Sequence, residues 1–238
     1  MSRIAFVAAL EREVRPLIKH WSVSEREYAG GRKFRVYENG AAIVVCGGIG
    51  TVAARRATEA VIQIYSPSVV YSVGYAGALD PALKVGDLLK PGRVVDAGDG
   101  SSAQMPDGQG LLVSHSLPAT VAQKSKLRES YGAQAVDMEA SSVARAAQAR
   151  GVGFEVLKVI SDEFNFELPA TDRFVDTEGR FHEARFAFFV ALRPWLWLRV
   201  IQLGRNSALA TRVLCAALRR ILTEEVRADS SAQATERR

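Results

Sequence analysis

Continuous apolar runs recur along the chain up to residue 163, and each ends in glycine or polar residues or is followed at once by a charged residue. They are RIAFVAAL (3–10), AAIVVCGG (41–48), SVVYSVGYAGAL (68–79) and FEVLKVISDE (154–163). Runs of this length are typical of strands that are covered on both faces of a sheet. Residues 51–65 instead repeat their apolar positions at helical spacing, with Thr51 placed to cap the helix. Strands that alternate with helices predict an α/β fold with three αβα layers around a central, mixed and twisted sheet.

The C-terminal segment has a different pattern, in which apolar residues recur with the period of an amphipathic helix. One side of the helix carries Ala210, Val213, Leu214, Ala217, Leu218 and Ile221, and the other carries Arg205, Arg212 and Arg219. Because proline favours a first helical turn and glycine a helix end, Pro194 and Gly204 are expected to divide the segment into at least two helices. We therefore predict an α/β domain over residues 1–192, an amphipathic helical extension over 193–225, and a disordered tail over 226–238.

The net charge of +5 is concentrated in the same segment. Between Arg193 and Leu222 there are six arginines and neither aspartate nor glutamate, so the rest of the chain is close to neutral. A charge confined to one segment argues against a nucleic-acid surface spread over the domain. Within RPWLWLR, tryptophans stand beside arginines, a composition typical of a membrane interface. The pattern is equally compatible with helices that close the core, and no run is apolar for long enough to cross a bilayer.

The cysteines, the histidines and the N-terminus indicate a cytoplasmic protein without a cofactor. Cys46 and Cys215 lie far apart in apolar contexts, which predicts reduced thiols in the core. The first apolar run is too short for an export signal and is followed at once by charges. The three histidines are isolated from one another and from the cysteines, so no metal site is expected. We predict a cytoplasmic location, with contact to the inner face of the membrane through Arg193–Leu222.

Carboxylates follow apolar stretches at three places where strands are expected to end. Glu11 and Glu13 follow the first run, Glu139 lies in AVDMEA, and Asp162 ends VLKVISD. Because ligands of α/β proteins bind beyond the carboxyl ends of the strands, these acids are candidates for a site. A carboxyl that is partly removed from water there holds a proton near neutral pH, as a general acid must. Each acid is equally compatible with a structural role, and Asp137 with the cap of the helix that follows it.

Five blocks of the chain occur in the order known from one enzyme family. They are VAALEREV, GGIGTVAA, VGYAGAL with LKVGDLL, AVDMEASSVA and VISDE, and together they cover most of the region from Arg3 to Pro169. In these blocks the chain resembles the superfamily of purine nucleoside phosphorylases and 5′-methylthioadenosine/S-adenosylhomocysteine nucleosidases. The resemblance implies cleavage of the N-glycosidic bond of a purine nucleoside by a homodimer or larger homo-oligomer, with neither a metal nor an organic cofactor.

The resemblance also implies a role for individual residues. Asp162 would protonate the leaving purine or hydrogen-bond to its N7 atom, and Ser161 would position the Asp162 side chain. Glu139 would accept hydrogen bonds from the ribose hydroxyls and stabilise the developing cation, while Met138 would pack against the sugar. Glu13 would orient or deprotonate the attacking water.

Two residues depart from the family pattern at positions that affect which molecule accepts the ribosyl group and how the sugar pocket is shaped. Ser72 stands where the hexameric phosphorylases carry an arginine for phosphate, so water is favoured as the acceptor, with phosphate left open as a co-substrate. Tyr75 stands where a serine or threonine is common, and with Gly74 it is expected to shape the pocket for the sugar or the nucleophile. His115 is a candidate contact to the purine and is equally compatible with an ordinary loop residue.

The short middle region, the AVDME block and the C-terminal ALRPWLW resemble one branch of the superfamily, the hopanoid-associated phosphorylases. That resemblance implies release of adenine from adenosylhopane, a lipid nucleoside, during hopanoid biosynthesis. Two alternatives stay open: a soluble 5′-methylthioadenosine/S-adenosylhomocysteine nucleosidase, and a membrane-associated module that binds nucleosides without catalysis. The set of acids favours an enzyme, and the basic C-terminal segment favours the lipid substrate.

Overall fold

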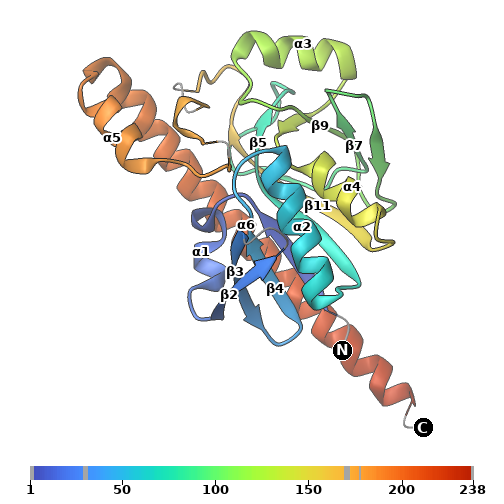
Figure 1. Ribbon diagram of the computed structural model, residues 1–238. Helices are drawn as coiled ribbons and strands as arrows, with labels where there is room; N and C mark the ends of the chain where they lie inside the picture. Colours follow the sequence, from blue (N-terminus) through green and yellow to red (C-terminus); the bar gives the residue numbers. More distant parts are fainter. Residues whose placement is uncertain (1–2, 29–31, 169–171, 177, 237–238) are drawn as a thin grey trace.

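The computed structural model describes residues 3–28, 32–168, 172–176 and 178–236 (Figure 1). In this part of the chain eleven strands form one mixed sheet with helices on both faces. The strands are β1 (Ile4–Ala8), β2 (Ser22–Tyr28), β3 (Arg32–Asn39), β4 (Ala42–Cys46), β5 (Val69–Ala78), β6 (Leu88–Leu89), β7 (Arg93–Asp96), β8 (Ser102–Gln104), β9 (Leu111–Ser114), β10 (Ala135–Asp137) and β11 (Gly153–Asp162). The helices are α1 (Glu11–Ile18), α2 (Thr51–Tyr65), α3 (Val121–Tyr131), α4 (Ala140–Gln148), the 3₁₀ helix η1 (Asp172–Phe174), α5 (Glu183–Ala191) and α6 (Pro194–Glu236).

The middle of the sheet is parallel and places the ends of its strands at one edge. β1 pairs in parallel with β4 and β5, and β5 pairs in parallel with β11. β10 runs antiparallel to β5 and continues the sheet toward β9, β7 and β8, whereas β3 and β2 extend the other side. The apolar runs of the sequence form β1, β4, β5 and β11, as predicted. The residues that follow these strands therefore meet beyond a common edge, where ligands of α/β sheets bind.

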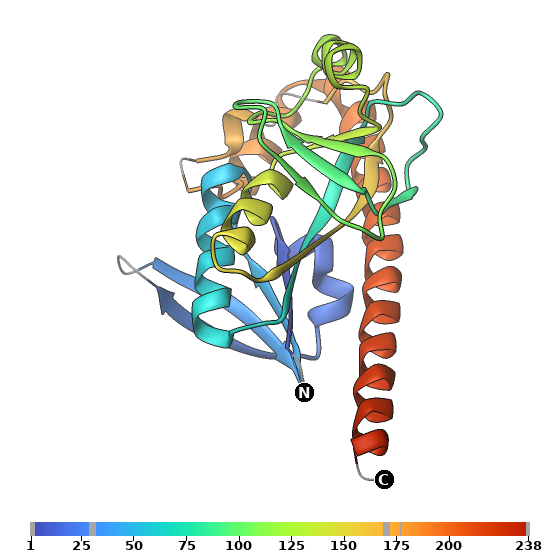
Figure 2. The same ribbon diagram turned by 90° about the vertical axis from the view of Figure 1, so that its right-hand side faces the viewer.

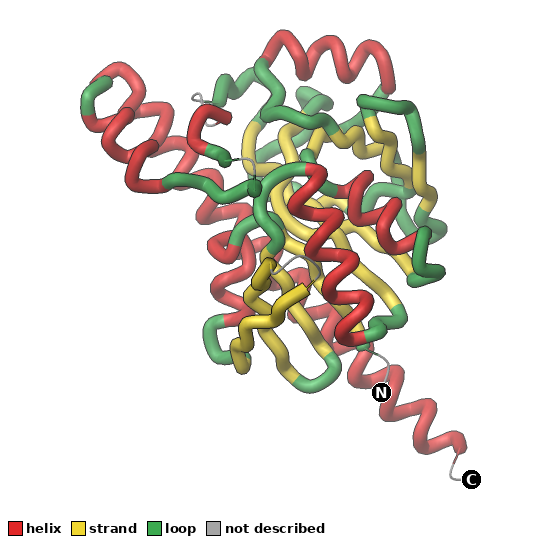
Figure 3. The backbone as a smooth tube through the Cα atoms, viewed as in Figure 1, coloured by secondary structure: helices red, strands yellow, loops and turns green. Residues whose placement is uncertain are grey.

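Alternate residues of β1 pack against different helix layers. Ile4, Phe6 and Ala8 belong to a buried cluster that includes α1 and α6. Ala5 and Val7 belong to a second cluster, which includes α2 and α4. The helices accordingly lie on both sides of the sheet (Figure 2, Figure 3). The predicted three-layer αβα architecture is confirmed.

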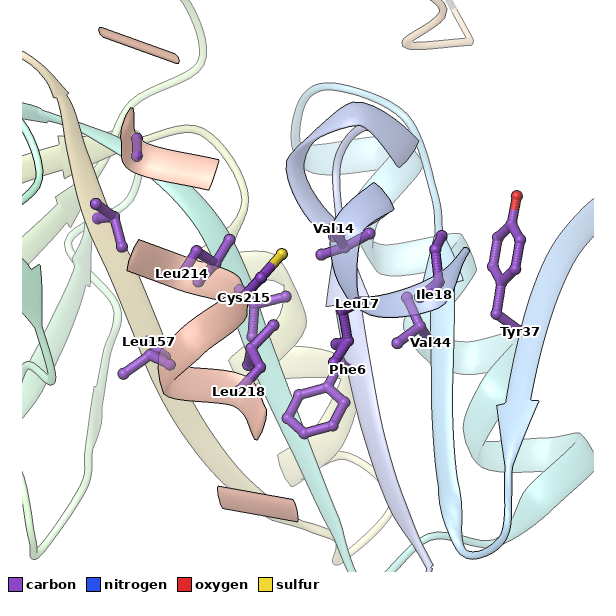
Figure 4. Packing of buried hydrophobic residues seen from close by; sticks show 14 of the residues in the cluster. Phe6, Val14, Leu17, Ile18, Tyr37, Val44, Leu157, Leu214, Cys215 and Leu218 are labelled. Atoms are coloured by element: carbon purple, nitrogen blue, oxygen red, sulfur yellow. The ribbon is translucent and has the colours of Figure 1, made fainter. Parts of the chain in front are cut away.

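The middle of α6 completes the core. Leu214, Cys215 and Leu218 are fully buried and lie in one cluster with Phe6 and Leu157 of the central strands (Figure 4). Full burial of each leucine stabilises the fold by about 1.5–3 kcal/mol. The amphipathic pattern predicted for this segment is present, and its apolar side packs into the same core as the strands. No helix in the described part of the chain is long and apolar enough to cross a membrane.

Three local features differ from expectation. α6 is one helix from Pro194 to Glu236, so Gly204 does not divide it. A glycine inside a helix costs only about 1 kcal/mol, which the packing of the following turns outweighs. The helix also covers residues 226–236, where a disordered tail was expected. Thr51 is the first residue of α2 and not its cap, because Gly50 occupies the N-cap position.

Candidate active site

A cavity of about 540 Å³ opens beyond the carboxyl ends of the central strands. The residues that follow β1, the end of β11, the turn between β10 and α4, and helix α3 form its polar end. This end is lined by Glu13, Lys124, Asp137, Glu139, Ser161 and Asp162. The volume falls in the range of pockets that hold small ligands. Glu13, Glu139 and Asp162 therefore line one cavity although they are far apart in the chain, whereas the candidate Glu11 is not among its lining residues.

Glu13 is a buried carboxylate with an unpaired oxygen. It lies in the first turn of α1, is 4% exposed, and its Oε2 accepts no hydrogen bond from a described residue. Burial, and next the charge of Glu139, raise the pKa of Glu13 to about 7. A carboxyl of this kind is about half ionised at neutral pH, as a general base needs to be.

Gly74 lies against the carboxylate of Glu13 and does not line the cavity. Its φ of 139° is one that other residues rarely adopt, and a Cβ at this position would lie 2.8 Å from Oε2 of Glu13. The structure thus places Gly74 next to the buried carboxylate and not in the substrate pocket for which it was predicted.

Asp137 and Glu139 have different partners although they lie in the same turn. The Oδ2 atom of Asp137 accepts a hydrogen bond of 2.8 Å from the backbone N–H of Ala140, the first residue of α4, although Glu139 and not Asp137 occupies the N-cap position of this helix. The Oε1 atom of Glu139 accepts one of 2.9 Å from the backbone N–H of Gly50, at the start of α2. Burial raises the pKa of Glu139. Both acids line the cavity, but Asp137 is held at the start of α4 and has a structural role, whereas Glu139 is held at the start of α2.

Lys158 joins these two carboxylates and is absent from the residues predicted for the site. It is 1% exposed in β11, with Nζ 2.9 Å from Oδ2 of Asp137 and 4.0 Å from Oε2 of Glu139. Burial opposes its charge, but Asp137 and then Glu139 outweigh burial and raise the pKa of Lys158. The available signal was a lysine within the apolar run VLKVIS, since a buried lysine needs a carboxylate partner.

Two donors hold Asp162. The Ser161 hydroxyl donates to Oδ1 at 2.8 Å, and Lys124 Nζ donates to Oδ2 at 2.5 Å. Asp162 is 4% exposed and Lys124 is 1% exposed. A Cβ on Gly77 would lie 2.8 Å from Oδ2 and 3.3 Å from Cε of Lys124, so a larger residue at this position would shift the pair. Lys124 is also absent from the predicted set, because nothing in the polar helix VAQKSKLRESY separates it from Lys126.

Of the remaining predicted residues, two line the cavity and two do not. Met138 and Tyr75 line the cavity. The Tyr75 hydroxyl lies 2.5 Å from Oγ1 of Thr211, so Tyr75 also ties β5 to α6. His115 and Ser72 do not line the cavity. The His115 ring hydrogen-bonds to a neighbouring backbone carbonyl, and Ser72 is buried within β5.

The other end of the cavity is apolar and comes from the C-terminal part of the chain. Its lining includes Leu168, Val175, Phe181, Phe186, Val200 and Leu203. Gly204 lines the same end and leaves space there, because no atom lies within 4 Å of a Cβ at this position. Arg12 is the one arginine among the described lining residues, and its guanidinium lies 5.2 Å from the centre of the Phe181 ring. The cavity is thus polar at the strand ends and apolar toward α5 and α6.

Comparisons with known proteins identify the family and support the fold. The family model described as the phosphorylase superfamily matches residues 3–123 and 113–192. The 5′-methylthioadenosine/S-adenosylhomocysteine nucleosidase of Staphylococcus aureus is 28% identical over 204 residues, covering 69% of this chain and 88% of the relative. Among solved structures, the 5′-methylthioadenosine nucleosidase of Arabidopsis thaliana has a TM-score of 0.71 at 20% identity, covering 94% of this chain and 95% of its own. The futalosine hydrolase of Helicobacter pylori has a TM-score of 0.59 at 24% identity, covering 68% and 88%.

Proposed function

The chain belongs to the phosphorylase superfamily, and on this premise we propose that it is an enzyme that cleaves the N-glycosidic bond of a purine nucleoside. The observation that carries the proposal is the cavity in which Glu13, Glu139 and Asp162 meet, each with different partners. An unpaired buried carboxylate destabilises a fold, so Glu13 favours an enzyme over a module that only binds nucleosides. We also infer, as the family resemblance implies, a homodimer or larger homo-oligomer that needs no metal or organic cofactor.

Each of the three acids acts at a different part of the reacting nucleoside or on the attacking water. Cleavage leaves an electron pair on the purine and a positive charge on the ribose, so the purine needs a proton and the ribose a nearby negative charge. Asp162 acts at the purine, and Glu139 acts at the ribose hydroxyls, with Met138 packed against the sugar. Glu13 accepts the proton of the water that attacks C1′, since its pKa of about 7 makes it an effective base near neutral pH.

Water is the acceptor that the polar end favours. A phosphate acceptor would need free cations, and Lys124 and Lys158 are each engaged with a carboxylate. Arg12 lies near Phe181, at the apolar end. The unpaired oxygen of Glu13 suits a water molecule and would repel phosphate. Phosphate is the alternative acceptor.

The apolar end of the cavity favours a substrate with a long apolar group on its ribose. With the purine at Asp162 and the ribose at Glu139, the apolar end is left for a 5′ substituent. We propose adenosylhopane as the substrate, with adenine and ribosylhopane as products. The alternative is 5′-methylthioadenosine or S-adenosylhomocysteine, which the Staphylococcus aureus relative is named for. A methylthio group is short and would leave most of the apolar end without contacts.

Adenine release decides between these substrates. The protein is supplied with adenosylhopane in detergent micelles or with 5′-methylthioadenosine, and adenine is measured by chromatography. We expect kcat/KM to be at least about tenfold higher for adenosylhopane, because each buried methylene contributes about 0.8 kcal/mol. A higher value for 5′-methylthioadenosine supports the alternative substrate, and no adenine from either nucleoside contradicts the proposed function. A free sugar as the product in the presence of phosphate identifies water as the acceptor, and a sugar phosphate identifies phosphate.

The helices that line the apolar end also carry apolar side chains on their outer side. The helical tip consists of Phe188, Leu192, Trp195, Trp197, Leu198 and Ile201, which are 50% to 81% exposed. Arg185, Arg193, Arg199 and Arg205 accompany it, and no acid lies between Arg185 and Arg205. We propose that the helical tip binds the anionic cytoplasmic face of the membrane. Compared with the predicted Arg193–Leu222, this contact begins earlier, at Arg185, and ends earlier, because from Ala210 onward the apolar side of α6 packs into the core.

The double variant Trp195→Ser/Leu198→Ser is expected to reduce binding to anionic vesicles by at least about tenfold. Insertion of one such side chain into the apolar layer contributes about 1.5–3 kcal/mol. Vesicle flotation measures the bound fraction, and Val23→Ser/Val52→Ser is the matched control, since Val23 and Val52 are exposed to 61% and 49% outside the helical tip. Equal binding of the wild type and the tip variant would contradict the membrane contact. Truncation after Leu192 is a poorer test, because it removes Leu214 and Leu218 from the core.

A further inference from the structure

Lys124 lies where a proton can reach the leaving purine. Its Nζ is 2.5 Å from Oδ2 of Asp162, and both side chains line the cavity. On the basis of the proposed cleavage reaction, we propose that Lys124 stores the proton that the purine receives, and that Asp162 passes it from Nζ to N7.

The hydrogen bonds around both groups indicate where the proton lies. Nζ faces three acceptors: Oδ2 of Asp162 at 2.5 Å, the backbone O of Glu163 at 2.8 Å and that of Phe166 at 3.5 Å. A neutral amine has two N–H donors and an ammonium has three, so these surroundings fit the ammonium. Asp162 accepts hydrogen bonds on both oxygens, from Lys124 and from Ser161, as an ionised carboxylate does. The resting pair is therefore an ammonium and a carboxylate, with the transferable proton on Nζ.

The other charged groups near this pair have partners of their own. The carboxylate of Glu163 lies 3.6 Å from Nζ of Lys84. Glu167 accepts a hydrogen bond of 3.1 Å from the backbone N–H at the start of α3. The carboxylates at the ribose end of the cavity pair with Lys158. The pair of Lys124 and Asp162 is consequently a neutral unit that faces the purine end of the cavity.

The proton moves as the glycosidic bond breaks. The electron pair of the C1′–N9 bond enters the purine, a proton passes from Nζ to Asp162, and Asp162 gives a proton to N7. Water adds to C1′ and gives its proton to Glu13. Transfer of that proton from Glu13 to Lys124 through solvent restores the resting enzyme. Nucleoside and water are thus converted into adenine and the sugar without a further reactant.

The test compares pH profiles of adenine release between pH 5 and pH 9, with whichever of the two nucleosides the wild type cleaves faster. Wild-type activity is expected to rise through about pH 7, as Glu13 ionises, and then to stay constant to pH 9. In Lys124→Met the ammonium that stores the proton is gone, so the proton must come from solvent, which supplies fewer protons as the pH rises. Its kcat should fall about 100-fold or more at pH 9 and less than about tenfold at pH 5. Lys126→Met, at an exposed lysine of the same helix, should match the wild type.

Lys124→Arg separates proton storage from positioning. A guanidinium keeps the charge and the donors but does not release a proton, so arginine should fail to restore activity at pH 9. Three results would each overturn the proposal. Lys124→Met could lose the same activity at every pH, or Lys124→Arg could restore the activity at pH 9. The wild-type activity could also decline between pH 7 and pH 9. If Lys124→Met shows no cooperative thermal unfolding, the variant is not folded. The activity of Lys124→Arg at pH 9 and the pH profile of the wild type then test the proposal. A wild type that releases no adenine contradicts the proposed function itself, whereas an active wild type with an equally active Lys124→Met contradicts only the role of Lys124.

Discussion

Replacement of Asp162 by asparagine is expected to lower the kcat of adenine release about 1,000-fold. Asparagine keeps the shape of the side chain, and its amide oxygen can still accept a hydrogen bond from Lys124 or Ser161, but it cannot pass a proton to the purine. KM should change much less than kcat, because the cavity keeps its shape. Steady-state rates of adenine release at pH 7 measure both constants.

The matched control for this variant is Glu163→Gln. Glu163 follows Asp162 in the chain, but its carboxylate lies at the surface, 3.6 Å from Lys84. Its replacement should leave the rate close to that of the wild type. Thermal unfolding accompanies the assay, because asparagine at position 162 leaves the buried charge of Lys124 without a counter-ion, at a cost of about 3–5 kcal/mol. A folded Asp162→Asn protein with the wild-type rate would exclude Asp162 from the chemistry.

Glu13→Gln is expected to lower kcat about 1,000-fold and to stabilise the protein at alkaline pH. Burial raises the pKa of Glu13 from 4.5 to about 7, so the folded state binds a proton more tightly than the unfolded state does. The stability that this proton provides is complete below pH 4.5 and is lost as the pH rises through 7. Glutamine stays uncharged, so at pH 8 the variant should be more stable by up to about 3 kcal/mol, since one pKa unit corresponds to about 1.4 kcal/mol.

Two measurements check this prediction. In the wild type, activity should decline below about pH 7, because a protonated Glu13 cannot accept a proton from water, and the residual activity of Glu13→Gln should lack that decline. Denaturant unfolding should show the gain in stability at pH 8 and little gain at pH 4. Glu11→Gln is the control, since Glu11 lies in the same helical turn with an exposed carboxylate 3.3 Å from Arg35. A fully active Glu13→Gln, or one without added stability at pH 8, would contradict the assignment of Glu13.

Prediction from the sequence succeeded where the pattern is local. The superfamily inferred from five ordered blocks is confirmed by the family match over residues 3–123 and 113–192. Residues 51–65 form a helix with the predicted bounds, and the four apolar runs form strands. These features depend on the spacing of apolar side chains within a short segment, and that spacing can be read directly from the sequence.

The partners within the site depend on contacts between distant segments. Lys124 reaches Asp162 because α3 lies over the end of β11, and Lys158 reaches Asp137 because β5 brings β11 and β10 together. A lysine in a polar helix carries no local sign of such a partner, and a lysine in an apolar strand indicates that a carboxylate partner is needed without identifying it. Their pairing follows from strand order and from burial, which decide whether a charge stays in water or needs a counter-ion.

The sequence by itself determined the αβα class, the acids that follow the strands and the concentration of arginine in the C-terminal segment. Only the tertiary structure decided which of these acids pair with a lysine and which one keeps an unpaired oxygen. It also decided that α6 continues through Gly204, with its middle in the core and its first turns exposed. The physical reason is that the period of a segment selects its secondary structure, whereas burial and charge pairing are set by neighbours that are distant in the chain.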